Sequence, residues 1–459
     1  MKKTKLSLLA FAAFLFTFSS SAQTGRSNNW CFTDQQNAML EAQNPDLSQQ
    51  KSDVEKYVQK YMAEHKNDIQ GKKAINYIIP VVFHVVTYDG LGYVSKNQID
   101  QVMSTINEDF QRTNSDANQT RSQFLPYVAD AQVEFRLAHL DPNGNCTEGI
   151  VRIESPLTID AGNSVKSVSY WNSKKYLNIW VVSNIAGGGG GSIIAGYAQF
   201  PTSGINSTYG IVMDNNFING SSRTLSHEIG HCFGLYHTFQ GGCSSSGAFG
   251  GDGVTDTPPS NTNGFSCSTS INSCNNIPSG DPYGFDVEDQ TENFMSYANC
   301  QNMFSLGQKS RMDAVLASNS TSTGLKQLSN GSNLIATGTA TPYNPAICIP
   351  IADFEYNKTL ICQGQSVLFT DFSYNASPTI WNWTFGGGGT PNTSPLENPT
   401  IVFNTPGVWS TTHEPGTTAG SALVTKPNII TVSSLTADYG GIIVDGFENS
   451  TNFNNDWII

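Results

Sequence analysis

Three histidines and one glutamate stand at a spacing that suits metal chemistry. Residues 226–237 read SHEIGHCFGLYH, which contains the pattern H-E-x-x-H-x-x-G-x-x-H. Residues four apart share one side of a helix, so His227 and His231 can bind the same metal ion. Gly234 can adopt the positive φ that ends a helix, and the turn would bring His237 round as a third ligand. Three imidazoles leave one position of a tetrahedral zinc ion open, as in catalytic sites.

Glu228 follows the first of these ligands and is placed to act as a general base. A helix that happens to carry several structural histidines is the plain alternative. The added Gly234 and His237 make the pattern much more specific than H-E-x-x-H alone, so we expect a zinc enzyme. The opposite face of the helix, with Leu225, Ile229 and Cys232, should be buried.

Length, composition and charge narrow the class of protein. At 459 residues the chain is expected to form two or three domains. Only 13% of the residues are charged and the net charge is −13. A chain without a basic stripe is unsuited to binding nucleic acid.

The N-terminus has the features of a secretory signal peptide. Three lysines within the first five residues precede an apolar run over residues 6–18, and Ala22 ends a group of small residues suited to cleavage. We therefore expect a signal peptide at residues 1–22 and a mature protein that is secreted or held at the cell surface. No second apolar run of about 20 residues follows, so no membrane span is expected. The nine cysteines of an exported chain imply at least one free thiol.

Residues 23–74 are predicted to be a propeptide. Within them, residues 53–62 have the apolar spacing of a one-sided helix, and Lys72-Lys73 offers a basic processing site. An ordinary N-terminal extension is the alternative.

Residues 75–345 are predicted to form an α+β catalytic domain. A capping box at Ser95 and Gln98 opens a helix, and the zinc-binding helix, expected to be long, follows the last predicted strand. Strands are expected over residues 75–86, 133–137, 176–182, 195–200 and 211–213.

Residues 240–300 lack periodicity and contain four cysteines, Cys243, Cys267, Cys274 and Cys300. Two disulfides would stabilise so long a loop, and the sequence leaves all three connectivities open.

An all-β sandwich is expected over residues 346–433, where Trp381, Trp383 and Phe385 alternate with polar residues. Cys348 and Cys362 are expected to pair within it. Residues 321–345, rich in Thr, Ser, Gly and Asn, are interpreted as a linker. Residues 434–459 are interpreted as the start of a further, truncated β module.

The zinc motif and several other segments resemble those of the pappalysin family of metzincin metalloproteases, in particular its bacterial, secreted members. The resemblance covers residues 75–320. Besides residues 227–239, it rests on PVVFHVV at 80–86, RTLS at 223–226, GDGVTDTP at 251–258, NFMSY at 293–297 and FSLGQKSRM at 304–312.

The resemblance implies further site residues. Met295 would form the Met-turn beneath the zinc ligands, and Tyr297 would stabilise the transition state. A structural calcium site would use Asp252, the carbonyl of Val254, Asp256 and Thr257, whose hard oxygens suit Ca²⁺. Disulfides Cys243–Cys274 and Cys267–Cys300 are implied. Cys31 stands where relatives carry a cysteine switch, so its thiol would occupy the open zinc position. A disulfide with Cys146, or an idle thiol, is the alternative.

Several residues depart from the patterns of related proteins. Cys232 replaces a frequent Trp, Phe32 follows Cys31 where a glycine is usual, and Asn299 stands where some relatives carry the acidic residue linked to basic specificity. Residues 381–388 resemble the polycystic-kidney-disease type of sandwich, with Gly387 in place of Asp. The ending of the chain is similar to the start of β modules in secreted Bacteroidetes proteins, which would place a sorting domain beyond residue 459.

We therefore expect a secreted zinc endopeptidase, made as a zymogen, that hydrolyses peptide bonds in protein or peptide substrates. The substrate would pair with an exposed edge strand at residues 195–200. The protein is expected to be a monomer. One alternative is an adhesin that binds through the sandwich after loss of catalysis, and another is a zinc hydrolase of small molecules.

Overall fold

The computed structural model describes residues 30–65, 77–187, 193–244, 251–261, 264–275, 282–344 and 347–434. The predicted signal peptide, the Lys72-Lys73 site and the module after residue 434 lie outside these ranges. No helix in the described ranges combines the length and apolarity needed to cross a bilayer.

A predominantly parallel sheet forms the centre of the larger domain. Its strands run in the order β3-β1-β5-β7-β6, with β4 also paired to β1, and β6 alone is antiparallel to its neighbour. The strands are β1 (Tyr77–Thr87), β3 (Val133–Leu137), β4 (Ile150–Glu154), β5 (Leu177–Val182), β6 (Gly196–Ala198) and β7 (Ile211–Asp214). Because parallel strands are covered on both faces, β1 and β5 are almost continuously buried, and their sequences are runs of β-branched residues.

Helices pack around this sheet, and four of those described contribute residues to the same apolar core. They are α1 (Thr33–Gln43), α2 (Asp46–Glu64), α3 (Lys96–Phe110), α4 (Thr224–Cys232), α5 (Leu306–Ala317) and α6 (Gly331–Ala336). The predicted capping box is present, because Ser95 and Gln98 exchange side-chain and backbone hydrogen bonds at the start of α3. Short β2 (Val128–Ala129) and β8 (Phe304–Ser305) pair beside α5.

The interpretation of residues 321–345 as a linker is wrong in part. Residues 331–336 form α6, and the preceding Leu325 and Leu328 are buried in the core of the larger domain. The average hydrophobicity of residues 321–345 is low, so the few apolar residues that anchor this segment in the core of the larger domain were not recognised.

The C-terminal sandwich packs two antiparallel-rich sheets against each other. One has the order β10-β18-β16-β12-β14 with β17, and the other β13-β15-β11-β9. Their bounds are β9 (Phe354–Tyr356), β10 (Leu360–Cys362), β11 (Ser366–Asp371), β12 (Ile380–Thr384), β13 (Gly389–Thr390), β14 (Thr393–Ser394), β15 (Thr400–Phe403), β16 (Gly407–Thr417), β17 (Gly420–Ser421) and β18 (Val424–Ser433). Trp383 and Phe369 lie in the core between the sheets.

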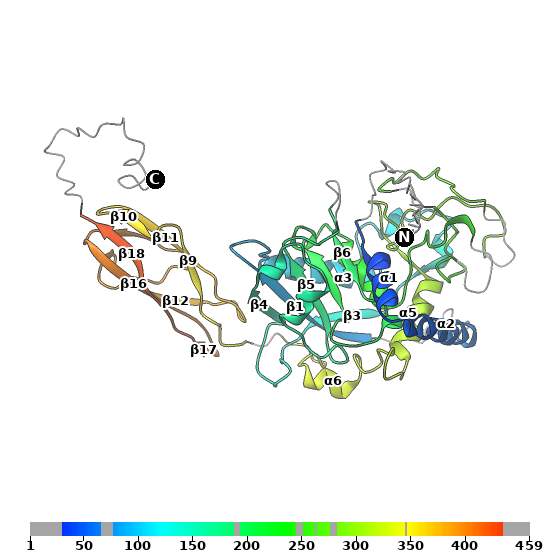
Figure 1. Ribbon diagram of the computed structural model, residues 1–459, viewed down its shortest axis with the longest axis horizontal. Coiled ribbons are helices and arrows are strands. Elements are labelled where there is room, and N and C mark those ends of the chain that lie inside the picture. The colour runs from blue at the N-terminus through cyan, green and yellow to red at the C-terminus, as the bar shows by residue number, and fades with distance from the viewer. Residues whose placement is uncertain are drawn as a thin grey trace, which may run out of the picture.

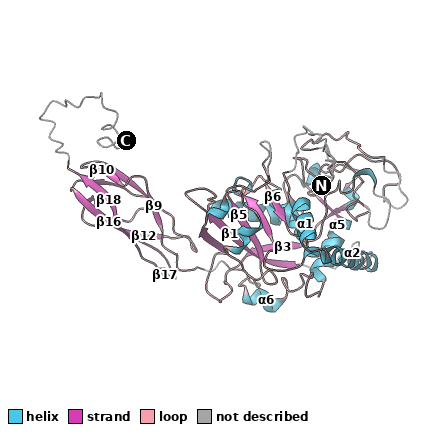
Figure 2. Cartoon of the chain, in the orientation of Figure 1, coloured by secondary structure: helices cyan, strands magenta, loops and turns pink. Residues whose placement is uncertain are grey.

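The sandwich lies at one end of the molecule and α1, α2 and α5 lie at the other (Figure 1). Between α4 and β8 the described residues form loops and one short 3-10 turn, Gly242–Ser244 (Figure 2). The α+β fold followed by an all-β domain agrees with the sequence-based expectation.

Candidate active site

Helix α4 fixes the first two histidines of the motif. It spans nine residues, shorter than the long helix expected, and every residue in it is buried. The helix ends at Cys232, and Gly234 adopts φ +87° two residues later. A residue with a Cβ would be strained there, so glycine permits the turn that carries the chain to His237.

The three imidazoles converge through their Nε2 atoms. The distances are 3.1 Å between His227 and His231, and 3.2 Å from each of these to His237. The other nitrogen of each ring, Nδ1, has an oxygen partner. Nδ1 of His227 lies 2.7 Å from the carbonyl of Phe294, Nδ1 of His231 lies 2.7 Å from that of Leu235, and Nδ1 of His237 lies 3.0 Å from Asp34 Oδ2. Nδ1 is therefore the protonated nitrogen in each ring, and three Nε2 lone pairs face one point.

This donor set fits a zinc ion. Tetrahedral Zn–N bonds of about 2.0–2.1 Å place neighbouring nitrogens about 3.3 Å apart, close to the separations found here. Burial lowers the pKa of His227 and His231 well below its ordinary value, which keeps both rings neutral and able to donate lone pairs. Cys31, His227, His231 and His237 are all buried, with ligand atoms within 4.8 Å of one another.

Glu228 lies next to the histidine triad and is completely buried. Its Oε2 accepts a hydrogen bond of 2.8 Å from the hydroxyl of Thr33, while Oε1 has no partner. Burial raises the pKa of this carboxyl to about 8, and the hydrogen bonds from the segment around Thr33 oppose that rise. A glutamate with a raised pKa and one unpartnered oxygen can take up and release a proton near neutrality.

The segment before α1 occupies the outer edge of β6. Backbone hydrogen bonds join Ala195 N to Trp30 O at 2.7 Å and Phe32 N to Gly196 O at 3.0 Å, and Cys31 pairs with Gly196 in parallel. The Cys31 thiol then lies 3.5 Å from Nε2 of His231. The edge predicted to pair with substrate is therefore covered by the chain's own N-terminal segment.

Tyr297 and Met295 lie on the turn that faces the histidines. The hydroxyl of Tyr297 donates to the Cys31 carbonyl at 3.4 Å, and its ring centroid lies 5.0 Å from that of His237. Met295 is buried beneath α4, where a Cβ added to Gly230 would lie only 2.5 Å from its Sδ atom. Glycine at position 230 thus allows the helix to approach this methionine closely.

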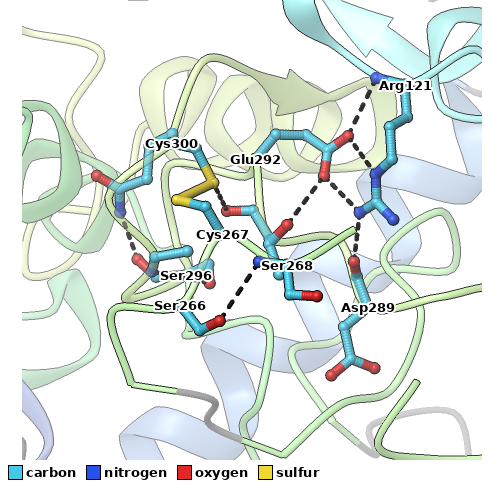
Figure 3. Close-up of a disulfide and its surroundings, with 11 residues drawn as sticks. Arg121, Ser266, Cys267, Ser268, Asp289, Glu292, Ser296 and Cys300 are labelled. Carbon is cyan, nitrogen blue, oxygen red and sulfur yellow. Dashed lines mark hydrogen bonds and ion pairs between the residues drawn. A yellow bond between two sulfur atoms is a disulfide. The ribbon is translucent and has the colours of Figure 1, made fainter. Parts of the chain in front are cut away.

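A disulfide and an ion pair hold the segment that carries Tyr297 (Figure 3). Cys300, three residues after Tyr297, is bonded to Cys267. Arg121 donates to both carboxylate oxygens of Glu292, which precedes the turn, and to the carbonyls of Asp289 and Thr269. One arginine therefore joins both sides of the loop that the disulfide closes.

The structure contains Cys243–Cys274 and Cys267–Cys300, the pairing that the family resemblance implied. The prediction of a Cys348–Cys362 disulfide is wrong. Cys348 is bonded to Cys146 of the larger domain, and Cys362 is an exposed free thiol. The alternative Cys31–Cys146 bridge is wrong for the same reason, because the sandwich places Cys348 against Cys146 while Cys31 is buried at the histidines.

Hydrogen bonds link three of the four calcium candidates directly. Asp252 accepts a hydrogen bond of 2.7 Å from the hydroxyl of Thr257, which also contacts the carbonyl of Val254 at 3.1 Å. Asp256 instead accepts from Ser305 Oγ at 2.6 Å and Gly307 N at 2.9 Å, so its carboxylate caps the start of α5.

The sequence did not reveal the roles of Thr33 and Asp34. Thr33 contacts Glu228, and Asp34 contacts His237, in both cases across about 200 residues of sequence. Their position two and three residues after Cys31 was the one available signal. The carbonyl acceptors of Phe294 and Leu235 have no sequence signal, since every residue carries one.

Comparisons with known proteins agree with this geometry. The family model of pregnancy-associated plasma protein-A, Peptidase_M43, matches residues 161–317. The chain is 31% identical over 255 residues to an extracellular metalloprotease of Pyricularia oryzae, covering 52% of this chain and 75% of that protein. It is 29% identical over 252 residues to an extracellular metalloprotease of Neurospora crassa, covering 51% and 73% respectively.

The fold is similar to a mutant of promirolysin from Tannerella forsythia. The match has a TM-score of 0.50 and 27% identity, and covers 67% of this chain and 99% of that one. A further match, with a TM-score of 0.15 and 26% identity, is to the PKD1 domain of the Vibrio cholerae metalloprotease PrtV, and covers 18% of this chain and 98% of that one.

Proposed function

The chain belongs to the pappalysin family of zinc metalloproteases, and from this premise we propose which of its residues bind zinc, cleave peptide bonds and keep the zymogen latent. Nε2 of His227, His231 and His237 would hold the ion. The observation that supports this most directly is the convergence of three unprotonated Nε2 atoms. The Nδ1 atom of each ring donates to an oxygen acceptor, which fixes the orientation of the ring.

Zinc bound there supplies a Lewis acid that acidifies water and polarises the substrate carbonyl. Glu228 takes the proton from the attacking water on a carboxylate oxygen and passes it to the leaving amine. The hydroxyl of Tyr297 donates a hydrogen bond to the oxygen on which negative charge develops. In the structure the Cys31 carbonyl accepts from this hydroxyl and stands in for the carbonyl of a substrate.

The edge of β6 would bind substrate backbone once the N-terminal segment has left. Residues 195–198 offer N–H and C=O groups that Trp30, Phe32 and the Thr33 side chain now satisfy. An extended peptide can replace these partners by strand addition. Substrates are therefore proteins or peptides, as expected for the family.

Latency is proposed to depend on Cys31. Its thiolate would occupy the fourth zinc position, which a water molecule takes in the active enzyme. The segment that carries Cys31 also covers the substrate-binding edge. The propeptide is assigned to residues 23–74, after a signal peptide at residues 1–22.

Calcium is proposed as a structural ion at Asp252, the Val254 carbonyl and Thr257. Burial raises the pKa of Asp252 to about 7, and a buried carboxylate of this kind gains from a nearby divalent cation. Asp256 would contribute indirectly, through its cap on α5. We assign the catalytic domain to residues 75–345, a polycystic-kidney-disease-type sandwich to residues 346–433, and the start of a further β module to residues 434–459.

The decisive experiment compares the parent with Glu228→Gln in casein cleavage. Each protein would carry a specific protease site inserted between residues 65 and 77, so that the N-terminal segment can be cut and removed. We expect kcat/KM to fall by at least a hundredfold, with bound zinc unchanged, because general base catalysis typically contributes 10²–10⁴-fold. Glu154→Gln, an exposed glutamate at the end of β4, is the matched control. A Glu228→Gln protein as fast as the parent would remove this mechanism and favour the adhesin.

A further inference from the structure

Helix α2 of the N-terminal segment covers a surface that lies beside the zinc ligands. It packs against α5 at the end of the molecule opposite the sandwich (Figure 1). Val58 is 1% exposed, and the partly buried Val54, Tyr61 and Met62 pack onto the main core. The helix is thus docked by an apolar face, with charged residues around it.

One charged residue of α2 is an exception, because it points into the interface. Both carboxylate oxygens of Glu55 accept hydrogen bonds from the terminal nitrogens of Arg311 on α5, and one also accepts from the Tyr236 hydroxyl at 2.9 Å. The Arg311 side chain is 2% exposed and that of Glu55 is 15% exposed. Such a bidentate, charge-assisted contact is stronger and more specific in geometry than a hydrogen bond between neutral groups.

The catalytic domain holds this arginine in place without α2. Nε of Arg311 donates to the Gly234 carbonyl at 2.6 Å, and its guanidinium carbon lies 4.7 Å from the centre of the Tyr236 ring. Phe200, Pro201 and Val315 line the small adjoining pocket. Because both anchors belong to the catalytic domain, we expect the two terminal nitrogens to keep their direction when α2 leaves.

The site adjoins the catalytic centre. Tyr236 precedes the ligand His237, and the Phe200 ring makes edge contacts with both His231 and Tyr236, at 5.3 and 5.1 Å between centroids. A ligand bound at Arg311 would therefore contact Tyr236, which directly precedes the proposed zinc ligand His237. Such a ligand would not occupy the metal position itself.

We propose that Arg311 and Tyr236 form a carboxylate-binding site in the mature enzyme, and that its ligand is the released α2 segment, bound back in trans through Glu55. The proposal rests on the zymogen function proposed above. Removal of α2 would uncover the guanidinium and leave its terminal nitrogens without their carboxylate partner. An amphipathic helix that supplies both a carboxylate and an apolar face restores the pairing. Cleavage alone would then leave the segment bound, and activity would depend on its dilution or destruction.

The test uses the full chain with a specific protease site inserted between residues 65 and 77. After cutting, the fraction of segment that co-elutes with the enzyme in size-exclusion chromatography is measured over a range of dilutions, and this gives its dissociation constant. We expect Glu55→Gln to raise this constant at least tenfold. Asp53→Asn, which removes the same charge from an exposed position on α2, is the control and should change it less than twofold.

A synthetic peptide of residues 30–65, with or without Glu55→Gln, would be added to separated enzyme as a second measurement. It does not depend on folding of the altered zymogen. We expect the unaltered peptide to bind at least tenfold more tightly and to inhibit cleavage at correspondingly lower concentration. Equal binding of the two peptides to active enzyme would overturn the carboxylate site and leave the proposed function intact. Glu55-dependent binding to an enzyme that cleaves no protein would leave the carboxylate site and remove the proposed function.

Discussion

The hydroxyl of Thr33 donates a hydrogen bond of 2.8 Å to the carboxylate of Glu228. The oxygen of this hydroxyl also accepts a hydrogen bond of 2.8 Å from the backbone N–H of Ala198. One side chain of the N-terminal segment therefore engages both the proposed catalytic base and the strand proposed to bind substrate. This contact occupies one of the two carboxylate oxygens of the base, in addition to any effect of Cys31 on zinc.

Thr33→Val should weaken latency. The variant removes the hydroxyl that donates to the fully buried Glu228, and a buried polar group that loses a partner typically costs about 1–3 kcal/mol. We expect a lower free energy of unfolding for the zymogen in urea, and faster release of casein-cleaving activity when activating protease is added. Thr33→Ser keeps the hydroxyl and should behave like the parent. Equal activation rates for the Val and Ser variants would show that this bond does not contribute to latency.

Cys31→Ser should give a zymogen that is partly active before any cleavage. The Sγ atom lies with the three histidine nitrogens in one buried cluster, and serine is a much weaker zinc ligand than a thiolate. We expect the uncut chain to hydrolyse a short fluorogenic peptide at least tenfold faster than the parent, with its zinc content retained. Cys362→Ser, which removes an exposed free thiol, is the control. Unchanged latency would favour the idle-thiol alternative.

The convergence of the three histidines was predictable because local geometry determines most of it. His227 and His231 share a helix face, and Gly234 can make the turn before His237, so a short segment contains the whole donor set. Strands β1 and β5 were predictable for a related reason, since both are buried on both faces and are therefore rich in β-branched residues, whereas β4 was not predicted.

The missed contacts depend on how distant segments dock. Cys146 and Cys348 are 202 residues apart, and their pairing follows from the face of the catalytic domain on which the sandwich lies. A closer partner, Cys362, made the local pairing look reasonable. Glu55 and Arg311 were likewise invisible as a pair, because an acidic residue on a charged helix is ordinarily exposed.

The Cys146–Cys348 disulfide should contribute to the stability of the whole chain. It closes a very long loop, and such bridges typically stabilise by about 2–4 kcal/mol. Other contacts at the same junction are modest: Asn375 Nδ2 donates to the Cys146 carbonyl at 3.2 Å, and the rings of Tyr93 and Phe372 meet at 5.5 Å. We expect the double variant Cys146→Ser/Cys348→Ser to lose about 2–4 kcal/mol in urea unfolding.

Limited proteolysis would show where that stability is lost. Cleavage between the catalytic domain and the sandwich should become faster in the double variant, while Cys362→Ser should match the parent in both measurements. A double variant as stable and as resistant as the parent would mean that the noncovalent contacts at the junction are sufficient.

Lys166 should make the stability of the protein depend on pH. The residue is 2% exposed, its Nζ donates to the Thr208 carbonyl at 2.6 Å, and it lies 5.1 Å from the centre of the Tyr197 ring. Burial lowers its pKa to about 7 from an ordinary value of 10.5. Between these two values the unfolded chain binds a proton that the folded protein does not, so the free energy of unfolding rises with pH across this window, by up to about 1.4 kcal/mol per unit.

The comparison with Lys166→Met isolates this effect, because methionine keeps the apolar stem without the charge. The free energy of unfolding of the parent minus that of the variant should increase by about 2 kcal/mol between pH 7 and pH 9. Groups common to both proteins cancel in this difference. The same difference for Lys60→Met, whose side chain is 74% exposed, should be flat. A flat difference for Lys166→Met would mean that Lys166 stays protonated in the folded protein, held by the Thr208 carbonyl and the neighbouring rings.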